Sequence, residues 1–581
     1  MAKIVYVCTR DVSKNPLIKQ RVGSVVRKLV PDNIPDAPCK FYDNGHIIYG
    51  ISTYSGNILE SHDSVCMGLA YPAAENWWKP LGEYPDGSFA IFRSDENYVE
   101  ALTDEAGSRS IWYYKDEEIF VTGTSQRAII SVIGKFHFDK RTIPWMLSSG
   151  TLGPSLSWCK NLHVVKPGGS VILNRKNWSV TTKLTAPPFT VASLSDEKHR
   201  EGMKQAIYDS FRDINIDFSK WTLPISGGSD SRGIVCLLKE TGKDISNMPS
   251  ITWGLKASLS EKNNDAYVAS AVAKAVGLKH RYFETDHCEA SVEKIFDRFI
   301  KCGEGRVDHV PGYMDGFATW KAIHESGSYG IIRGDESFGW DNAITEHNSR
   351  LINNLTLCDD YNNLEYFEES GYEKQLLPDY LQRREGETVN TWADRLYEEF
   401  TIPALMAALN DLKLSYTEVI NPLLSRKIML QTRTLPDHLR EDKKIFREIV
   451  NSFLPDIKYA TKQATIQEQG LFTFPETIAI ITNELSMPYM KELFPAEFLQ
   501  KVITGMRNPI TQKRNMASMQ TKLFIKKLIP AFVKEKIRNN IPKPTLNTGV
   551  LAFRIYMIGK TYRMLAEDIK TAETVKSLTP A

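Results

Sequence analysis

The chain has 581 residues, of which 42% are hydrophobic and 24% are charged, and its formal net charge at pH 7 is +2. A single hydrophobic core stops growing at roughly 250–300 residues, so this length predicts at least two domains. The near-neutral balance argues against a global role in nucleic-acid or membrane binding. No apolar run approaches the roughly 18 residues of a membrane-spanning helix, and the first twenty residues lack the core of a secretory signal. The eight cysteines contain no CxxC pair, so we expect a cytoplasmic protein with reduced thiols and no structural zinc.

Residues 1–190 are predicted to form a β-rich domain. Short runs of β-branched and aromatic residues recur there, broken by glycine, asparagine and aspartate, as in HIIYGIST (46–53), SFAIFRS (88–94), EIFVTGTS (118–125) and SVILNRKNWSVTTKL (170–184). Such runs are typical of strands separated by turns. The next stretch, TAPPFTVASLSDEKHR (185–200), is rich in proline, serine and threonine, which favours a domain boundary there.

From residue 196 onward, strand-like and helix-like segments alternate. EKHREGMKQAIYDSFRDI (197–214) has helical spacing, and short apolar strands follow at WTLPI (221–225), MPSITWG (248–254) and YGII (329–332). Strands that alternate with helices predict an α/β domain with a parallel sheet covered on both faces. Beyond about residue 400 the chain is predicted to be mostly helical, so the second domain spans residues 196–581.

The most informative stretch is LPISGGSDSRGIVCLLKE (223–240), where a glycine-rich loop separates a strand from a helix. Glycines let the backbone approach a ligand, and the first amides of a helix lack intrahelical partners and carry the positive end of its dipole. The layout predicts an anion cradle, although a structural glycine turn is the alternative. The loop lacks the lysine of the GxxxxGK[ST] phosphate loop. Asp230 within it suits bound phosphates only if a cation such as Mg²⁺ lies between them.

SGGSDS (226–231) resembles the pyrophosphate loop of ATP pyrophosphatases, and the chain more narrowly resembles the asparagine synthetase family. Three further segments match that family in order: SITWG with its following helix, IIRGDESFGW, and NPLLSRKIMLQTRTLPDHLR with KKIFREIVNSFLPDIKYATKQA. The resemblance spans roughly residues 196–475. The RGDE segment is about two residues shorter than the family's SGxGxDE, and Arg333 replaces its usual serine.

This resemblance implies roles for particular residues. ATP would be bound by Ile225, Ser226, Gly227, Gly228, Ser229, Asp230, Ser231, Trp253, Arg333 and Gly334. Asp230 and Asp335 would hold Mg²⁺. Lys462, in YATKQA, would stabilise negative charge at the adenylated carboxyl, whereas a solvated surface lysine is the alternative reading.

The β-rich half resembles the glutaminase domain of the same family, an N-terminal-nucleophile fold. YPDGSFAIFRSDENYVEALTDEAGSRSIWYY and EEIFVTGTSQRAII resemble strands of that domain. Glutamine-using relatives begin Met-Cys-Gly and use the cysteine as nucleophile, whereas this chain has Ala2 there. Cys8 is not a substitute, because it has no free amine and is predicted to lie within a strand. The resemblance therefore implies a degenerate domain, as in lasso-peptide cyclases and β-lactam synthetases.

Two smaller segments carry weaker predictions. CGEGRVDHVPGYMDG (302–316) precedes the third motif strand, so it is expected either to bind substrate or to be a salt-bridged surface loop. The candidate substrate-binding residues are Glu304, Arg306, Asp308 and Glu336. Residues 501–543 carry eleven basic residues against Glu535, which predicts a basic amphipathic helix. That helix either packs on the core with a solvated face or docks an acidic partner or a membrane.

These observations predict an ATP- and Mg²⁺-dependent ligase that adenylates a carboxylate, releases pyrophosphate and transfers the acyl group to an amine. The leading subclass is a peptide macrolactam cyclase, with a small-molecule or peptide substrate and a leader peptidase as partner. One alternative is amidation by ammonia of aspartate or another carboxylate such as a sugar uronate. An alternative of another class is a catalytically silent binding protein. The sequence does not name the carboxylate or the amine, and it leaves the oligomeric state open.

Overall fold

The computed structural model describes residues 3–55, 57–71, 75–185, 187–286, 288–339, 345–365, 367–465, 468–507 and 543–577. The predicted basic segment 501–543 lies outside this description except for residues 501–507 and Lys543. Among the described residues, no helix is both long enough and apolar enough to cross a bilayer.

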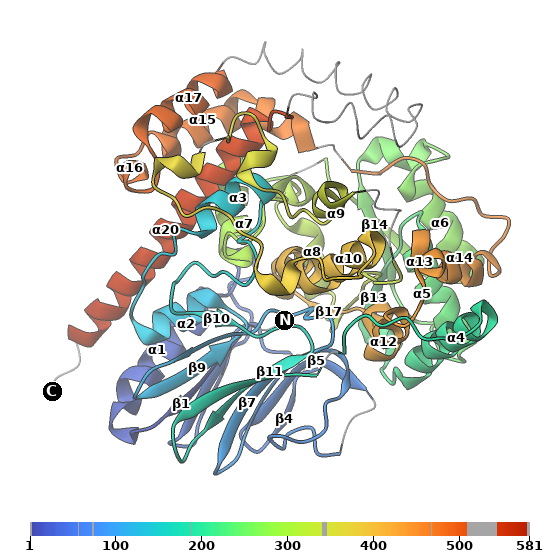
Figure 1. The fold of residues 1–581 in the computed structure, drawn as a ribbon, viewed down its shortest axis with the longest axis horizontal. Helices are drawn as coiled ribbons and strands as arrows, with labels where there is room; N and C mark the ends of the chain where they lie inside the picture. Colours follow the sequence, from blue (N-terminus) through green and yellow to red (C-terminus); the bar gives the residue numbers. More distant parts are fainter. Residues whose placement is uncertain are drawn as a thin grey trace.

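Two six-stranded antiparallel sheets form the first third of the chain (Figure 1). The first has the order β10-β8-β9-β1-β3-β2 and is built from β1 (Ile4–Thr9), β2 (Lys40–Asp43), β3 (Ile47–Ile51), β8 (Trp112–Lys115), β9 (Ile119–Gly123) and β10 (His163–Val164). The second has the order β12-β11-β7-β6-β5-β4 and is built from β4 (Leu59–Ser61), β5 (Ser64–Tyr71), β6 (Asp86–Ser94), β7 (Tyr98–Thr103), β11 (Gly169–Asn174) and β12 (Ser179–Leu184).

Alternation along β1 explains how these sheets are layered. Ile4, Tyr6 and Cys8 belong to the core between the two sheets, whereas Val5 and Val7 belong to the cluster shared with helices α1 (Asn15–Lys28) and α2 (Gln126–Ile133). Successive side chains of a strand point to opposite faces, so a strand that is apolar at every position can be buried on both. The result is a layer of helices, then a sheet, then a second sheet.

A five-stranded parallel sheet forms the centre of the second part. Its order is β15-β14-β13-β16-β17, built from β13 (Trp221–Pro224), β14 (Ser250–Gly254), β15 (His280–Glu284), β16 (Gly330–Ile332) and β17 (Glu418–Ile420). One face packs on a core that includes α4 (Asp196–Asp213), α5 (Ser229–Glu240), α6 (Asp265–Val276), α12 (Arg426–Thr432) and α14 (Lys444–Asn451). The other packs on α7 (Val292–Gly303), α8 (Ala318–Glu325) and α11 (Ala407–Leu414). The predicted parallel sheet with helices on both faces is confirmed.

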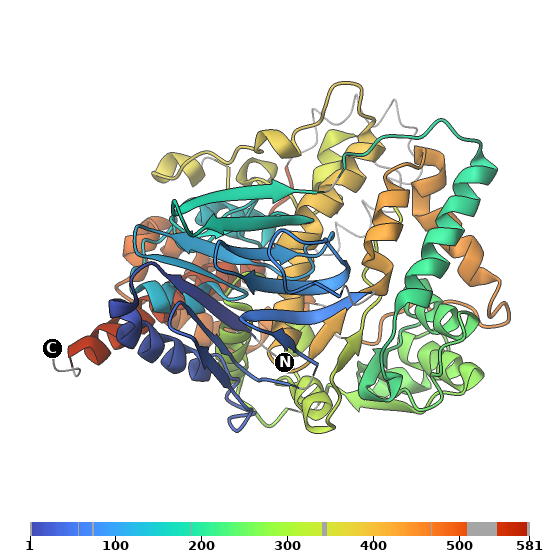
Figure 2. The same ribbon diagram turned by 90° about the horizontal axis from the view of Figure 1, so that it is seen from below.

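The helical remainder joins the two parts. It includes α3 (Thr142–Ser149), α9 (Glu346–Ile352), α10 (Val389–Leu396), the π-helix η8 (Tyr397–Met406), α13 (Asp437–Arg440), α15 (Pro475–Leu485), α16 (Met490–Leu493), α17 (Ala496–Arg507) and α20 (Thr548–Ser577). Helix α20 packs against α2, α3, α15 and α17, and both views show it extending away from the parallel sheet, alongside the antiparallel sheets (Figures 1 and 2). One hydrophobic cluster consequently runs from β1 through α2 to α20 and α7.

Candidate functional site

The predicted loop lies where the order of the parallel sheet changes direction. From β13 the chain adds β14 and β15 on one side, and then β16 and β17 on the other. Open α/β sheets bind ligands at such a switch point, outside the carboxyl ends of the strands. Residues 226–231 follow β13, and residues 333–336 follow its neighbour β16. A Cβ on Gly334 would stand 3.1 Å from Cβ of Asp230, so the two segments touch although a hundred residues separate them.

Hydrogen bonds inside the loop fix its shape. The hydroxyl of Ser231 accepts from the amide of Ser226 at 3.0 Å, and the hydroxyl of Ser226 accepts from the amide of Gly228 at 3.2 Å. Ser229 donates its hydroxyl to Asp230 at 3.0 Å. Helix α5 begins at Ser229 without a side-chain cap, since Gly228 is its N-cap residue. The loop therefore presents the uncapped start of a helix to the switch point.

The two loop glycines have different surroundings. A Cβ on Gly227 would lie 2.2 Å from Cβ of Ala460, so close packing requires glycine there. The amide of Gly227 donates to Asp265 at 3.0 Å, and burial raises the pKa of that carboxyl. A Cβ on Gly228 would meet only the Ser226 hydroxyl, at 3.4 Å. Gly228 thus borders open space, into which an added side chain would project.

Lys443 joins the loop to the segment after β16. Its ammonium lies 3.0 Å from Asp230 Oδ2 and 2.8 Å from Glu336 Oε1. Burial alone would lower the pKa of Lys443, but Glu336 and Asp230 hold it above its ordinary value. Burial raises the pKa of Glu336; Lys443 opposes that rise and the charge of Asp230 adds to it. The sequence analysis did not predict a role for Lys443. The one feature that marks it in the sequence is its position beside Lys444, at the start of the helical run KIFREIV.

The two carboxylates predicted to bind Mg²⁺ lie on opposite segments of the switch point. Asp230 pairs with Lys443, whereas Asp335 pairs with Arg333 at 2.9 Å. Asp335 Oδ2 is buried and has no hydrogen-bond partner among the described residues. No cluster of three or more potential metal-ligating side chains occurs in the described ranges. Glu336 lies at the same edge, but the described carboxylates do not gather into a full set of metal ligands, so the residues present fit a metal held partly by a ligand's own oxygens.

The two apolar residues predicted to lie beside the adenine have different environments. Ile225 is buried in the core beneath the loop, and its backbone pairs with β14 through Ile251. Trp253, at the end of β14, is partly buried and packs edge-on against Trp320 with a centroid distance of 5.4 Å. Only the Trp253 ring therefore reaches a surface at the carboxyl ends of the strands.

The segment that carries Lys462 crosses the same edge of the sheet. Ala460 donates its amide to Gly227 O at 3.0 Å, and Ala464 O accepts from the amide of Leu255 at 2.8 Å, just after β14. The backbone of Lys462 also pairs with Asn264 in a short parallel bridge. Its side chain, however, is 63% exposed and contacts Glu261 at 3.2 Å. The structure thus brings the Lys462 backbone beside the loop and leaves its ammonium in solvent.

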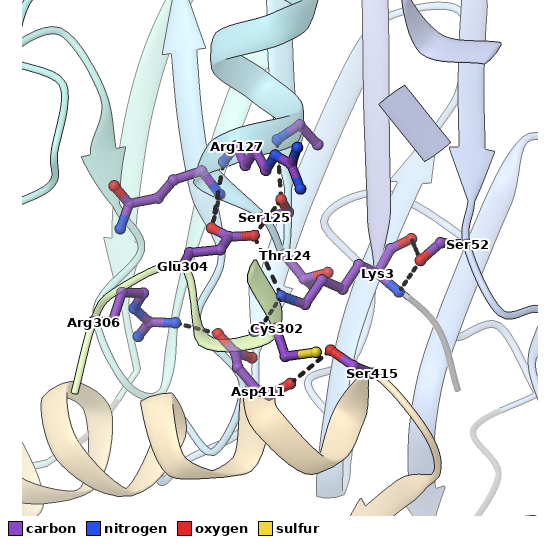
Figure 3. A network of polar contacts seen from close by, with 12 residues as sticks. Lys3, Ser52, Thr124, Ser125, Arg127, Cys302, Glu304, Arg306, Asp411 and Ser415 are labelled. Carbon is purple, nitrogen blue, oxygen red and sulfur yellow. Dashed lines mark hydrogen bonds and ion pairs between the residues drawn. The ribbon is translucent and has the colours of Figure 1, made fainter. Parts of the chain in front are cut away.

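Three of the four residues predicted to contact substrate lie instead inside the molecule. Glu304 caps the start of α2, accepting from the amide of Gln126 at 2.8 Å and from the hydroxyl of Ser125, and it pairs with Lys3 at 3.3 Å (Figure 3). Burial alone would raise the pKa of Glu304, but Lys3, Ser125 and their neighbours hold it below its ordinary value. Glu304 therefore ties the first strand to the second part of the chain.

Arg306 and Asp308 are held in the same way. Arg306 forms a buried ion pair with Asp411 of α11 (Figure 3). It also donates to the hydroxyl of Ser110 at 2.6 Å. Asp308 pairs with Arg554 of α20 at 2.6 Å, and that contact helps to keep the pKa of Asp308 well below its ordinary range, against the effect of burial. These carboxylates and guanidinium groups are already paired, so the segment 302–308 is a buried junction between the two parts of the chain. Glu336 alone of the predicted substrate residues lies at the switch point.

Cys8 is poorly suited to act as a thiol nucleophile. Cys8 lies within β1 with none of its surface exposed, and burial raises its pKa to about 11. This agrees with the expectation that Cys8 cannot replace a terminal cysteine. Ala2, on which the prediction of a lost nucleophile depends, lies outside the described residues.

No family model matches this chain, and no curated protein matches its sequence. Among solved structures it is similar to the allosteric regulatory enzyme of purine biosynthesis, with a TM-score of 0.21 and 10% identity. It is also similar to glutamine phosphoribosylpyrophosphate amidotransferase from B. subtilis complexed with ADP and GMP, with a TM-score of 0.20 and 8% identity. Each match covers 43% of this chain, and the chain spans just under two thirds of those proteins, 64% and 65%. Overlap of this extent establishes no shared fold.

Proposed function

We propose that the protein is an ATP-dependent ligase that activates a carboxylate as its acyl-adenylate and joins it to an amine. The observation that carries the proposal is the meeting of loop 226–231 with residues 333–336 at the switch point of the parallel sheet. That edge combines an uncapped helix start, open space beside Gly228, a partly buried lysine and the three carboxylates of Asp230, Asp335 and Glu336.

The proposed reaction has two steps. An oxygen of the substrate carboxylate attacks the α-phosphorus of ATP, and pyrophosphate leaves. The amine nitrogen then attacks the acyl carbon, AMP leaves with the former carboxylate oxygen, and the amine loses a proton. Activation of this kind is needed because a carboxylate has no good leaving group. Catalysis would rest on positioning and on charge stabilisation.

Particular residues would divide this work. The start of α5, with the hydroxyls of Ser226, Ser229 and Ser231, would hold the phosphates, and Trp253 would contact the adenine. Asp230 and Asp335 would hold Mg²⁺, which neutralises phosphate charge when bound. Glu336, whose pKa is raised by burial, would accept a proton more readily than an exposed glutamate.

Two lysines are candidates for stabilising negative charge at the reacting carboxyl. We favour Lys443 over the sequence-predicted Lys462, because the Lys443 ammonium lies between Asp230 and Glu336 and its side chain is 16% exposed, whereas that of Lys462 is 63% exposed. A preorganised donor at such a centre contributes about 10²–10³-fold in rate. Single-turnover amide formation by Lys443→Met and Lys462→Met compares the two assignments directly.

Within this function, a macrolactam cyclase whose amine belongs to the substrate is the preferred subclass. The buried pairing of Lys3 with Glu304 at the start of β1 favours a structural role for the antiparallel sheets. We therefore propose that glutamine is not a substrate and that the amine arrives with the peptide or small molecule.

The experiment that tests the proposal is calorimetric titration of MgATP into wild-type protein and Gly228→Val. The valine would fill the open space beside the helix start, so we expect at least tenfold weaker binding with unchanged thermal stability. Gly23→Val is the matched control, since Gly23 lies in α1 with no atom within 4 Å of an added Cβ. Absence of MgATP binding by the wild type, or equal binding by Gly228→Val, would refute the nucleotide site.

A further inference from the structure

A cavity of about 330 Å³ lies between the two parts of the chain, and none of the residues assigned above to ATP or Mg²⁺ lines it. Its walls come from residues 152–156 and 164–167, from the connecting segment 184–189, from Tyr380 and from the π-helix η8. Its size is typical of small-molecule sites, which start at roughly 300 Å³. The cavity is therefore large enough to hold a ligand other than the nucleotide.

Much of the wall is apolar. Trp112, Leu152 and Phe400 line the cavity and are buried, while Phe189 and Pro403 line it and are partly buried. Ligand sites are typically lined by hydrophobic and aromatic side chains, with a few polar groups that fix the orientation of the ligand. This wall favours a ligand with an apolar body, and its aromatic side chains suit a ring.

Charged side chains also line the cavity, and the cations outnumber the carboxylates. They are Lys166, Arg306, Arg384 and Arg433 against Glu398 and Glu399. The two buried guanidinium groups already have partners, because Arg306 pairs with Asp411 and Arg433 pairs with Glu398 at 2.7 Å. These two groups are therefore not free to bind the charge of a ligand.

Lys166 supplies a charge that has no counterion. It is exposed, so it marks the end at which the cavity meets solvent. In the described part of the chain its ammonium lies over the ring of Tyr380, at 4.3 Å from the centroid, and forms no ion pair. An exposed lysine on a flexible stem can turn toward an anion in the cavity without breaking an existing salt bridge.

Arg384 lies at the same exposed end of the cavity. It approaches Glu399 at 3.7 Å, which is longer than a hydrogen bond, and its side chain is 46% exposed. Glu399 is also paired with Arg395 at 3.1 Å, and Arg395 in turn pairs with Glu387 at 2.7 Å. Two guanidinium groups and two carboxylates thus balance in charge, and Arg384 keeps donors that a ligand can use. The uncompensated charge at this end is that of Lys166.

One wall of the cavity is an unusual helix. Residues Tyr397–Met406 form a π-helix with Pro403 inside it, and Phe400, Pro403 and Ala404 of this helix line the cavity. Proline has no amide hydrogen, so Pro403 cannot donate to the hydrogen bonds of the helix. π-Helical turns are rare and occur frequently at functional sites. The helix therefore adds a second reason to regard this cavity as a binding site.

We propose that this cavity binds a small monocarboxylate with an aromatic body, whose carboxylate pairs with Lys166 and Arg384. The apolar wall would hold the ring. The guanidinium of Arg384 can donate two parallel hydrogen bonds to a carboxylate, and Lys166 supplies the charge that balances it. A single negative charge is the best match, because the other charges of the lining are already paired. This ligand is not the carboxylate that the proposed ligase would activate, since the cavity contains none of the residues assigned to ATP.

The test uses naphthaleneacetate as the probe and follows its binding to the full-length protein by saturation-transfer NMR. Naphthaleneacetamide has the same shape without the charge, and acetate has the charge without the ring. We expect a dissociation constant of about 1 mM for naphthaleneacetate, which is what a ligand of about fourteen non-hydrogen atoms can achieve. The amide should bind about fivefold more weakly, the upper end for an exposed ion pair, and acetate should show no binding.

Three variants locate the site. Lys166→Met keeps the length of the side chain and removes the charge, so it should weaken naphthaleneacetate binding about three- to fivefold and leave the amide unaffected. Lys160→Met is the matched control, because Lys160 is an exposed lysine that does not line the cavity. Ala404→Phe places a ring on the wall and should weaken the binding of both naphthalene ligands. Melting temperatures identify any variant that fails to fold, and Lys166→Met keeps the test decisive because an exposed lysine is not needed for folding.

Four results would overturn the proposal. They are equal binding of naphthaleneacetate and its amide by the wild type, equal affinity of Lys166→Met and Lys160→Met for naphthaleneacetate, unchanged binding by a folded Ala404→Phe, and no saturation transfer to naphthaleneacetate at about ten times the expected dissociation constant. No nucleotide is present in these measurements. Failure of the ligase proposal would therefore leave this test unaffected.

Discussion

Replacing Lys443 by methionine should destabilise the protein in a way that depends on pH. The substitution removes the ammonium that lies 2.8 Å from Glu336 and 3.0 Å from Asp230. Breaking a buried pair by removing one partner costs about 3–5 kcal/mol, because the other charge remains buried. The Asp230 side chain is 31% exposed, whereas that of Glu336 is 3% exposed, so only Glu336 pays this cost in full. We expect a loss of about 3 kcal/mol at pH 8, the lower end of that range.

The sign of the pH dependence follows from Glu336. Burial already raises its pKa in the folded state, and removing Lys443 raises it further. An acid with a raised folded pKa binds more protons when folded than when unfolded, so stability falls as pH rises through that interval. The variant should therefore be penalised most above the raised folded pKa, and the penalty should shrink as pH falls toward the ordinary glutamate value. Lys443 itself stays protonated at pH 5 and pH 8, so its own titration contributes no slope.

The assay is urea unfolding followed by tryptophan fluorescence at pH 8 and pH 5, with EDTA present to keep metal ions away from the carboxylates. Lys444→Met is the matched control, because Lys444 is the adjacent residue, is exposed and makes no comparable contact with a buried carboxylate. Equal unfolding midpoints for the two variants at both pH values would refute the pairing of Lys443 with Glu336. A penalty for Lys443→Met that grows as pH falls would refute the sign worked out for Glu336.

Three further predictions follow from packing and burial. Gly227→Ala should destabilise the protein by about 1–3 kcal/mol, because the added methyl group would overpack against Ala460. Gly228→Ala should leave the melting temperature unchanged, because an added Cβ there meets open space. Equal melting temperatures for the two variants would contradict this difference. Arg554→Ala leaves the largely buried Asp308 with His309 as its remaining partner and should cost about 3 kcal/mol, the lower end of the range for a broken buried pair, measured by urea unfolding beside the surface variant Arg200→Ala. Thiol labelling of native protein at pH 7.5 should modify Cys39 and Cys288 first, because the other six thiols are buried; early modification of Cys8 would argue against its position in β1.

Those parts of the fold that depend on short-range sequence patterns could be predicted from the sequence. Alternating strands and helices after residue 196 indicated the parallel sheet, and the β-branched runs before residue 190 indicated the antiparallel sheets. The loop 226–231 could be recognised because its glycines, hydroxyls and following helix are contiguous. The order of motifs also placed residues 333–336 after a neighbouring strand, which suffices to bring Gly334 beside Asp230.

The long-range pairs could not be predicted. Lys443 and Lys462 each sit in a plausible sequence context, and only the packing of α14 decides which ammonium reaches Asp230. Likewise, Glu304 and Asp308 look like ligand-binding carboxylates in a glycine-rich loop. Their partners are Lys3, 301 residues earlier, and Arg554, 246 residues later. No local pattern specifies which distant cation will neutralise a given carboxylate.

The buried junction at residues 302–308 connects the antiparallel sheets to the second part of the chain. The charge of Glu304 is buried against Lys3, Ser125 and the first amides of α2, all of which come from the first part of the chain. Separating the two parts would leave Glu304 without Lys3 and would expose the cluster that runs from β1 to α20. Each unpaired buried charge alone costs several kcal/mol, a large fraction of the 5–15 kcal/mol by which a typical domain is stable. The sheets near the start of the chain are therefore needed for the stability of the second part, whether or not they carry any chemistry of their own.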